Sequence, residues 1–296
     1  LDRVDSYLIV GREADALDLV RQSELALQSA GTQAELQTDR EQLSQRISEQ
    51  RRRLRKEIIV RNPAIVIDDV ATRLNSPAKQ ILPTEKGFIV LGDNPRTVIE
   101  YTGQSQQAQS RTITTDMESW TEAALIDEGR IAFTDGLNVT VATLKNGTTS
   151  TQKSTSPSPI SALVGYNSRL YALSPNERQV MRSSVTPGLA TFSGWLKEPD
   201  EALTQSRDLA IDGSIYVLVA NGLRQYTQGV PASGPKLDPV EPALVDAKHL
   251  SYQADGQHFF ITENNRLLVF KKTGKFVAQY LLESGAQIRD AYVDET

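Results

Sequence analysis

The sequence predicts a mainly β fold, a β-propeller preceded by an α-helical hairpin or coiled-coil stem, and three observations carry this prediction. Residues 5–57 contain no proline and are rich in Ala, Leu, Gln, Glu and Arg, a helix-forming composition. Beyond Pro63, short runs of β-branched and aromatic residues alternate with Gly, Asn, Asp, Ser and Pro, as in strands joined by turns. These runs recur about every forty residues, the length of a four-stranded propeller blade.

Residues 1–60 form the predicted stem. Apolar residues from Ala14 to Ala30 fall at steps of three or four, which places them on one helix face, and Gly31 reads as a helix stop. A second series has the a/d spacing of a coiled coil or helical hairpin. Its members are Leu36, Leu43, Ile47, Leu54 and Ile58. The basic run at 51–53 is interpreted as a solvated helix flank. Pro63 ends the helix, so residues 61–296 are assigned to the propeller.

Five strands of the predicted propeller share a turn followed by a mostly apolar run. Their anchor residues are Ile89, Ile131, Leu170, Ile215 and Phe259. The separations are 42, 39, 45 and 44 residues. We expect a strand before each anchor, and a second strand follows each one after a short polar turn. A two-sheet sandwich could use some of the same strands, but it would not predict this period.

Residues 288–294 resemble the first strand of a sixth repeat, which predicts about six blades with the last incomplete. A propeller protects its sheet edges, usually by completing the last blade with a strand from the other end of the chain. Residues 58–60 and 64–67 are the candidates for that strand. Leu1-Asp2-Arg3 is neither an initiator methionine nor a signal peptide, so we expect this chain to be part of a longer protein.

Composition excludes several kinds of chemistry. The chain has 296 residues and a net charge of −5, and this negative charge argues against nucleic acid as a partner. It has no cysteine, which excludes a thiol nucleophile or a thiolate metal site. No stretch reaches the length of a membrane-spanning helix. His249 and His258, on different predicted strands of one blade, are interpreted as ordinary structural or surface histidines. No GxSxG, HExxH, P-loop or GxGxxG motif occurs, so no catalytic, cofactor-binding or metal-binding residue is predicted.

Three weaker features have structural interpretations. Asp-Gly and Asn-Gly pairs, such as 135–136 and 212–213, supply positive φ in tight turns rather than calcium ligands. Asp68-Asp69 and Asp294-Glu295 could meet if the two termini completed one blade, and we expect them to be solvated. Trp120 and Trp195 lie late in successive repeats, where packing between blades is favoured over a sugar platform.

The last complete repeat, residues 265–280, ends in Lys-Thr-Gly-Lys-Phe-Val-Ala-Gln-Tyr and resembles the cadence of NHL-type and related six-bladed propellers. The order of helical stem and propeller also resembles the C-terminal region of bacterial membrane-anchored proteins that carry a PP2C-type phosphatase-like domain. No repeat ends in Trp-Asp, so WD40 identity is not supported. The resemblance implies a fold, a tendency to bind partners and the extracytoplasmic side of a bacterial membrane.

The sequence therefore predicts a non-catalytic binding or scaffolding module and no cofactor. Loops on one propeller face would bind a protein, a peptide or a wall polymer, a membrane would be reached only through an upstream segment, and the stem would permit a homodimer. The alternative is a propeller enzyme, a lyase or hydrolase with an acidic site in the central channel. That alternative requires acidic and basic side chains to converge on the axis, and the sequence shows no repeated placement of such residues.

Overall fold

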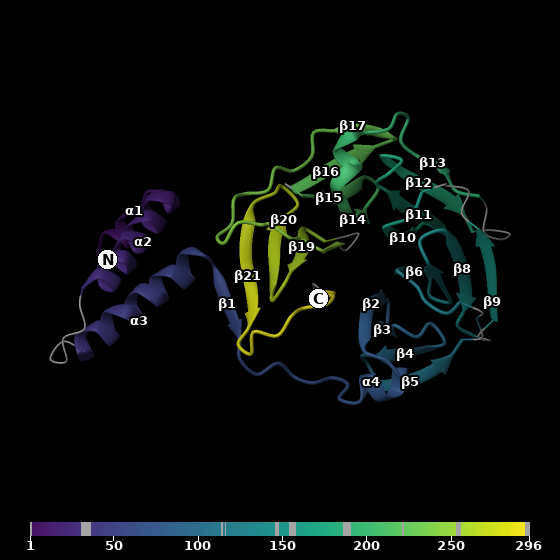
Figure 1. Cartoon of the computed structure of the whole chain (residues 1–296), viewed down its shortest axis with the longest axis horizontal. Coiled ribbons are helices and arrows are strands. Elements are labelled where there is room, and N and C mark those ends of the chain that lie inside the picture. Colours follow the sequence, from purple (N-terminus) through teal and green to yellow (C-terminus); the bar gives the residue numbers. More distant parts are fainter. Residues whose placement is uncertain are drawn as a thin grey trace.

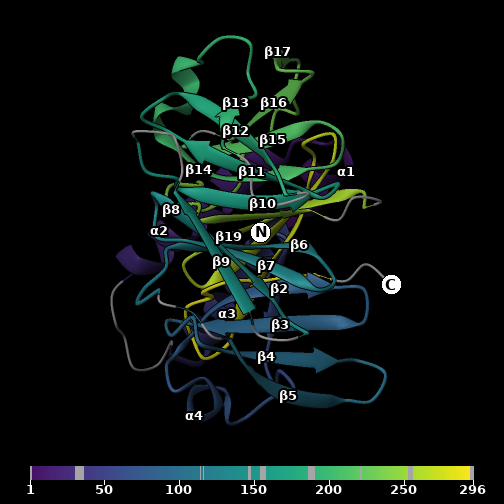
Figure 2. The ribbon, with the colours of Figure 1, turned by 90° about the vertical axis from the view of Figure 1, so that its right-hand side faces the viewer.

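Five β-sheets surround a common axis in the computed structural model, which is a five-bladed β-propeller with helices at its N-terminal end (Figure 1). The structure describes residues 2–30, 37–113, 115, 117–145, 148–153, 158–185, 191–220, 222–252 and 256–293. Four consecutive antiparallel strands form each blade, with the first nearest the axis and the fourth toward the rim (Figure 2). We call the first strand of each blade its inner strand.

The blades follow one another in chain order. Blade 1 contains β2 (Ala78–Thr84), β3 (Gly87–Gly92), β4 (Thr97–Thr102) and β5 (Gln107–Thr112). Blade 2 contains β6 (Glu122–Asp127), β7 (Arg130–Thr134), β8 (Asn138–Thr143) and β9 (Thr148–Lys153). Blade 3 contains β10 (Ala162–Tyr166), β11 (Arg169–Ser174), β12 (Gln179–Ser184) and β13 (Ser193–Gly194).

Two further blades complete the set. Blade 4 contains β14 (Ser206–Ile211), β15 (Ile215–Val219), β16 (Gly222–Thr227) and β17 (Val230–Ala232), and the 3-10 helix η2 (Glu201–Gln205) precedes it. Blade 5 contains β18 (His249–Tyr252), β19 (His258–Glu263), β20 (Arg266–Lys271) and β21 (Phe276–Leu282). A fifth strand, β1 (Glu57–Val60), joins blade 5 at its outer edge and pairs in parallel with β21.

The blade count differs from the sequence prediction, because five sheets form and not six. Residues 288–293 were expected to begin a sixth blade, but this described part of the segment forms no strand. A strand requires a partner with which it forms a hydrogen-bonded ladder, and residues 288–293 join none of the five sheets. Two segments were expected to complete an incomplete last blade. Residues 58–60 lie instead in β1, which adds a fifth strand to blade 5, and residues 64–67 form no strand.

The repeat is also displaced by one residue in blade 1. Ile89 and Leu91 pack against Ile131 and Phe133, so these two pairs face each other across the interface between blades 1 and 2. Side chains alternate along a strand, so Val90 points to the opposite side of blade 1 from Ile89 and Leu91. Phe133 points to the side of blade 2 that faces the preceding blade, and Val90 is the residue of blade 1 with the corresponding orientation. The predicted repeat period is therefore retained, but the orientation of the first anchor, Ile89, is displaced by one residue relative to the other anchors.

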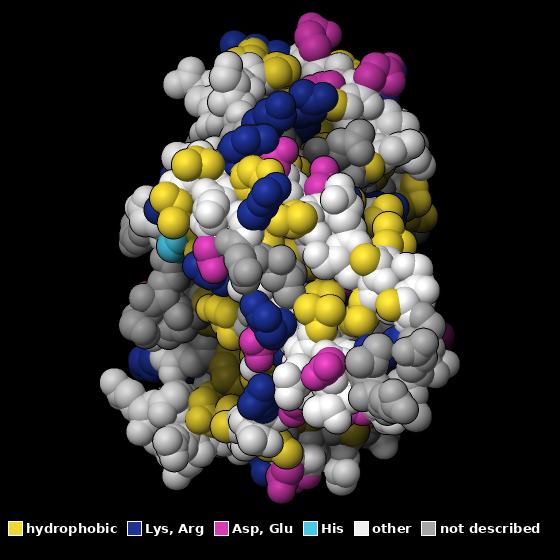
Figure 3. Space-filling view, turned by 90° about the vertical axis from the view of Figure 1, so that its left-hand side faces the viewer, with side chains coloured by type: hydrophobic (Ala, Val, Ile, Leu, Met, Phe, Trp, Pro, Cys, Tyr) yellow, Lys and Arg dark blue, Asp and Glu magenta, His cyan; other side chains and the backbone are white. Residues whose placement is uncertain are grey.

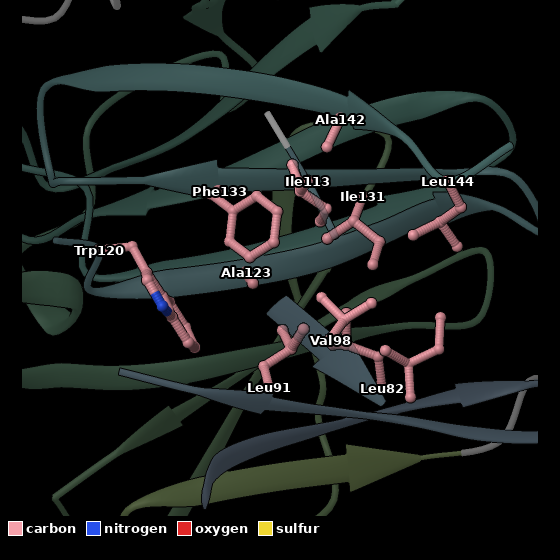
Figure 4. Packing of buried hydrophobic residues seen from close by; sticks show 11 residues of the cluster. Leu82, Leu91, Val98, Ile113, Trp120, Ala123, Ile131, Phe133, Ala142 and Leu144 are labelled. Atoms are coloured by element: carbon pink, nitrogen blue, oxygen red, sulfur yellow. The ribbon is translucent and has the colours of Figure 1, made fainter. Parts of the chain in front are cut away.

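Apolar side chains between neighbouring blades form the core. Figure 4 shows the interface between blades 1 and 2, where Trp120 stands edge-on to Phe133 at 5.7 Å between ring centroids. The Trp120 indole also donates a hydrogen bond to the Gly92 carbonyl at 2.9 Å, so this buried polar group is satisfied. The contacts of Trp120 thus agree with the predicted packing role. Trp195 is partly buried and stands edge-on to Tyr171.

The N-terminal stem has three described helices rather than the two of a hairpin: α1 (Asp2–Ile9), α2 (Glu13–Ser29) and α3 (Gln37–Leu54). Its core contains Val4, Ala16, Val20, Ile47 and Leu54. Ile47 and Leu54 belong to the predicted a/d series, whereas Leu43 is 38% exposed and Leu36 lies outside the described residues. Within the basic run, Arg51 pairs with Glu24 and Arg53 with Asp5, which agrees with a solvated flank. Figure 3 shows the face of the molecule on this side, where Lys and Arg side chains lie close to Asp and Glu.

A buried polar cluster joins the stem to blade 5. The Glu263 carboxylate accepts hydrogen bonds from the Val245 and Asp246 N–H groups at 2.6 and 2.5 Å and pairs with Arg266. Arg266 also donates to the carbonyls of Pro242 and Ala243 and to the Gln279 side chain. Gln279 in turn donates to the Arg55 carbonyl at the end of the stem. We call Glu263, Arg266 and Gln279 the rim cluster.

A short helix covers the free face of blade 1. Helix α4 (Val70–Leu74) packs Leu74 against Val90 and Ile99, on the side of the sheet away from blade 2. The residues from β1 to α4 run along the edge of the ring from blade 5 to blade 1 (Figure 1). Blade 1 therefore has apolar cover on the side where no neighbouring blade in the ring packs against it.

Candidate functional site

A cavity of about 350 Å³ lies on the propeller axis. It is lined by residues of all five inner strands, β2, β6, β10, β14 and β18, together with Asp290, Ala291 and Tyr292. A concave site on which a few polar groups converge is the usual place for ligand binding. This axial cavity is the candidate functional site.

One position recurs in every inner strand and defines the polar lining. In blades 1 to 5 it pairs with the second-strand residues Val90, Phe133, Ala172, Val217 and Ile261. The inner-strand residues at this position are Ile81, Ala123, Leu163, Leu209 and Leu250. The residues that immediately precede them are Gln80, Glu122, Ala162, Asp208 and His249. We call this second set the axial ring, because four of its five members line the cavity.

Two members of the axial ring fasten neighbouring inner strands. The Asp208 carboxylate of blade 4 accepts a hydrogen bond from the Leu250 N–H of blade 5 at 2.7 Å. The Gln80 side chain of blade 1 accepts from the Ala123 N–H of blade 2 at 3.1 Å and donates to the Ala123 carbonyl at 2.9 Å. Inner strands of neighbouring blades do not share a ladder, so these side chains satisfy backbone groups that face the axis.

Close approach of the inner strands also explains a glycine. A Cβ at Gly165 in β10 would lie 1.9 Å from the Leu125 carbonyl oxygen of β6. Only a residue without a side chain fits between these two backbones. Gly165 lines the cavity, and its place inside a predicted strand is a sequence signal of close backbone contact that our sequence analysis missed.

Glu122 differs from the other acidic group of the axial ring because its carboxyl has no hydrogen-bond partner within the described part of the chain. Burial raises the pKa of Glu122 to about 8, and the negative charges of Asp208 and Asp290 contribute to this rise. The positive charge of Lys79 acts in the opposite direction. Lys79 itself lies over the Trp120 ring at 4.0 Å and donates to the Trp120 carbonyl, so it is not paired with Glu122.

Asp208 and His249 form the second titratable part of the lining. Burial raises the pKa of Asp208 to about 6, although His249 and the N–H groups of Leu250 and Leu209 favour its ionised form. The nearest nitrogen of His249, Nδ1, lies 3.8 Å from an Asp208 carboxylate oxygen. Burial also raises the pKa of Asp290, although the hydrogen bonds from the N–H groups of Ile81 and Ala291 act to lower it. Three carboxyl groups therefore share a poorly solvated space.

This convergence contradicts the sequence analysis, which found no repeated placement of charged residues on the axis. The strand position is repeated, but it holds an acidic residue or histidine in only three blades, with Gln80 in blade 1 and Ala162 in blade 3, so the sequence pattern alone does not reveal it. His249 lines the cavity and is not merely a surface residue, whereas His258 does not line it and lies in β19, paired with Lys271. The two histidines lie on different strands of blade 5, as expected.

Other sequence candidates lie away from the axis. Asp69 pairs with Arg73 at 2.7 Å at the start of α4, and its expected neighbours Asp294 and Glu295 lie outside the described residues. Gly136 and Gly213 have φ values of 102° and 107°, as the turn interpretation of the Asp-Gly pairs predicts. In the ranges that the structure describes, no group of three or more His, Asp or Glu side chains is arranged to hold a metal ion. No described helix is long and apolar enough to cross a membrane.

Comparisons with known proteins report the fold alone. No family model matches the sequence, and no curated protein matches it. A chain in the crystal structure of a nidogen/laminin complex is similar over 72% of this chain and 83% of its own length, with 12% identity and a TM-score of 0.53. The β-propeller domain of Cps50 (Swd1) from Myceliophteria thermophila covers 66% of this chain and 65% of its own length, with 10% identity and a TM-score of 0.48. The similarity to the chain in the nidogen/laminin structure, at 12% identity, is one of fold alone.

Proposed function

We propose that this chain is a non-catalytic binding module whose axial cavity receives a basic side chain of a protein or peptide partner. The observation that carries the proposal is the Glu122 carboxyl, which faces the cavity without a hydrogen-bond partner among the described residues, near Asp208 and Asp290. A β-propeller fold is consistent with a binding or scaffolding role. The similar chain in the nidogen/laminin structure belongs to a complex of those two proteins.

Electrostatics favour a cationic occupant. Ionised carboxylates that share a poorly solvated space repel one another, and the raised pKa of Glu122 reflects part of that cost. An ammonium or guanidinium group inside the cavity would offset the repulsion and donate hydrogen bonds to the free carboxylate. The cavity of about 350 Å³ is large enough for one extended side chain with its hydration water.

Short peptides test the class of ligand directly. Blocked pentapeptides of alanine that carry Arg, Lys, Gln or Glu at the centre would be titrated into the protein and followed by NMR. We expect the Arg and Lys peptides to perturb signals of the cavity residues, and the Gln and Glu peptides to leave them unchanged. Affinity should rise between pH 6 and pH 8, because Glu122 has a pKa of about 8 and accepts a cation best when it has lost its proton.

Matched variants make this test specific. Glu122→Gln should weaken binding of the Arg peptide about tenfold or more, because a charge-assisted hydrogen bond is lost. Glu198→Gln removes the same charge from an exposed loop between blades 3 and 4 and should have no effect. Equal binding of the Arg and Gln peptides, or undiminished binding by Glu122→Gln, would refute the cationic pocket.

A propeller lyase or hydrolase is the second candidate, and the separation of pKa values in the cavity favours it. Glu122 has a pKa of about 8 and Asp208, beside His249, has a pKa of about 6. General acid–base chemistry uses carboxyl groups with separated pKa values. Hydrolysis of polysaccharide or ester libraries by the wild-type chain, lost in Glu122→Gln, would favour the enzyme. Asp208 is engaged by two backbone N–H groups, which favours the binding module.

The remaining proposals concern the larger protein to which the module belongs, its location and its oligomeric state. We propose, from the resemblance and the order of stem and propeller, that the module belongs to a larger bacterial membrane-anchored protein on the extracytoplasmic side. The stem presents Ile9, Val10 and Leu25 with exposed fractions of 85, 66 and 65%, which supports a homodimer through the helices. Sedimentation of the full chain tests this association, and a monomer at all concentrations would contradict it.

A further inference from the structure

Residues 288–293 lie between blade 5 and blade 1 beside the axis, although they form no strand (Figure 1). The Ile288 N–H donates to the Asn264 carbonyl in the β19–β20 turn of blade 5 at 2.8 Å. Arg289 donates to the Ala78 carbonyl of β2 at 2.8 Å, and Asp290 accepts from the Ile81 N–H of β2 at 2.8 Å. The segment therefore bridges the two blades at the ends of the propeller sequence.

The sequence of this segment repeats that of an inner strand. Residues 288–294 read Ile-Arg-Asp-Ala-Tyr-Val-Asp, and residues 206–212 of β14 and its turn read Ser-Arg-Asp-Leu-Ala-Ile-Asp. Arg289 and Asp290 thus correspond to Arg207 and Asp208. Both stretches continue with three apolar or aromatic residues and a second aspartate, so the match extends over the length of an inner strand.

The two aspartates make the same contacts. One oxygen of Asp208 accepts from the Leu250 N–H of the next inner strand at 2.7 Å, and the other accepts from its own following residue, Leu209, at 2.8 Å. One oxygen of Asp290 accepts from the Ile81 N–H at 2.8 Å, and the other from its following residue, Ala291, at 2.8 Å. Leu250 and Ile81 occupy the same position in their inner strands, as defined above.

We infer that residues 288–293 are a latch that takes the place of a sixth inner strand, closes the ring between blades 5 and 1, and completes the axial cavity. Asp290 is its positioning residue and extends the axial ring to a sixth member. Asp290, Ala291 and Tyr292 form part of the cavity wall, so the cavity is incomplete when the latch is released. Docking of the latch must therefore strengthen binding of a ligand that contacts this wall, and binding of the ligand must stabilise the docked latch by the same free energy.

Amide hydrogen exchange of the full chain without ligand tests the latch, with a matched pair of variants. Asp290→Ala should accelerate exchange in residues 79–84 about tenfold or more, because the Ile81 N–H loses its acceptor and the segment that covers it, while residues 248–252 keep their wild-type rates. Asp208→Ala should do the reverse. Arg289→Ala, which removes only the contact to the Ala78 carbonyl, should accelerate residues 79–84 in the same direction.

Four outcomes separate the alternatives. Unchanged exchange in residues 79–84 of both Asp290→Ala and Arg289→Ala would overturn the latch. Uniform acceleration over all blades would also overturn it, because a general loss of stability is not a local release. The coupling to ligand rests on the proposed function, and weaker binding of the Arg pentapeptide by Arg289→Ala would support it. Failure of that peptide to bind even the wild-type chain, with the local exchange pattern intact, would refute the cationic pocket and leave the latch standing.

Discussion

The rim cluster and the axial ring both contain buried or partly buried carboxyl groups, and they differ in how completely the polar atoms of these groups are satisfied. In the rim cluster, Glu263 is 2% exposed and its carboxylate has three partners. Burial acts to raise the pKa of Glu263, but the Asp246 and Val245 N–H groups and Arg266 lower it overall. In the axial ring, burial and neighbouring negative charge raise the pKa of Glu122 to about 8.

The difference separates structural from functional charge. A buried ion whose donors and acceptors are all paired holds elements together, here the stem, residues 242–246 and blade 5. A partly buried carboxyl that lacks a partner destabilises the free protein, and its cost is recovered only when something binds. Substitution of one residue in each cluster should therefore change stability in opposite directions.

The largest effect is expected at the rim. Glu263→Ala leaves the buried Arg266 guanidinium without its carboxylate and two backbone N–H groups without an acceptor, so the free energy of unfolding should fall by about 3–5 kcal/mol. Chemical denaturation of the full chain measures this change. Glu198→Ala, on an exposed loop, is the control and should change stability by less than about 0.5 kcal/mol. A loss of less than 1 kcal/mol at Glu263 would contradict the structural role.

Glu122→Gln should raise the free energy of unfolding rather than lower it, and the size of the rise should depend on pH. Glutamate ionises near pH 4.5 in the unfolded chain and near pH 8 in the folded one, so the folded state binds more protons between these values and stability falls as pH rises. Glutamine does not ionise. The variant should match the wild type at pH 5 and exceed its stability at pH 8 by on the order of 3 kcal/mol.

Thermal unfolding at pH 5, 6, 7 and 8 follows this prediction. The difference in melting temperature between Glu122→Gln and the wild type should widen steadily from pH 5 to pH 8. A difference that is constant across this range would show that Glu122 is not ionising with a raised pKa. A variant that is less stable than the wild type at pH 8 would show that Glu122 has a partner in the folded protein.

The period of the apolar runs was sufficient to predict the propeller, because each blade repeats a local pattern of strand and turn. The second strands after each anchor were also predictable, since only a few polar residues separate them from the first. The blade count was wrong because residues 288–294 carry the sequence of an inner strand, whereas residues 288–293 contact β2 through side chains and join no sheet. Sequence pattern reports the propensity of a segment, and pairing depends on its neighbours.

The candidate site was hidden because its residues differ in type. Gln80, Glu122, Asp208 and His249 share a position only after the blades are superposed, and the one-residue displacement in blade 1 obscures even that alignment. The bond between Asp208 and the Leu250 N–H joins residues that are 42 apart and depends on the angle between two blades. The repeated Arg-Asp pair at 207–208 and 289–290 was the available signal.

The smallest effect is expected where the stem meets the propeller through exposed charges. Arg21 of α2 pairs with Glu241 at 2.9 Å, but 53% of the Arg21 side chain is exposed. Water screens such a pair and its side chains lose freedom when they meet, so Arg21→Ala should lower the free energy of unfolding by less than about 1 kcal/mol. Denaturation in low and high salt measures it, and the small difference should shrink further in salt. A loss as large as that of Glu263→Ala would show that the stem is held by its surface charges and not by the buried rim cluster.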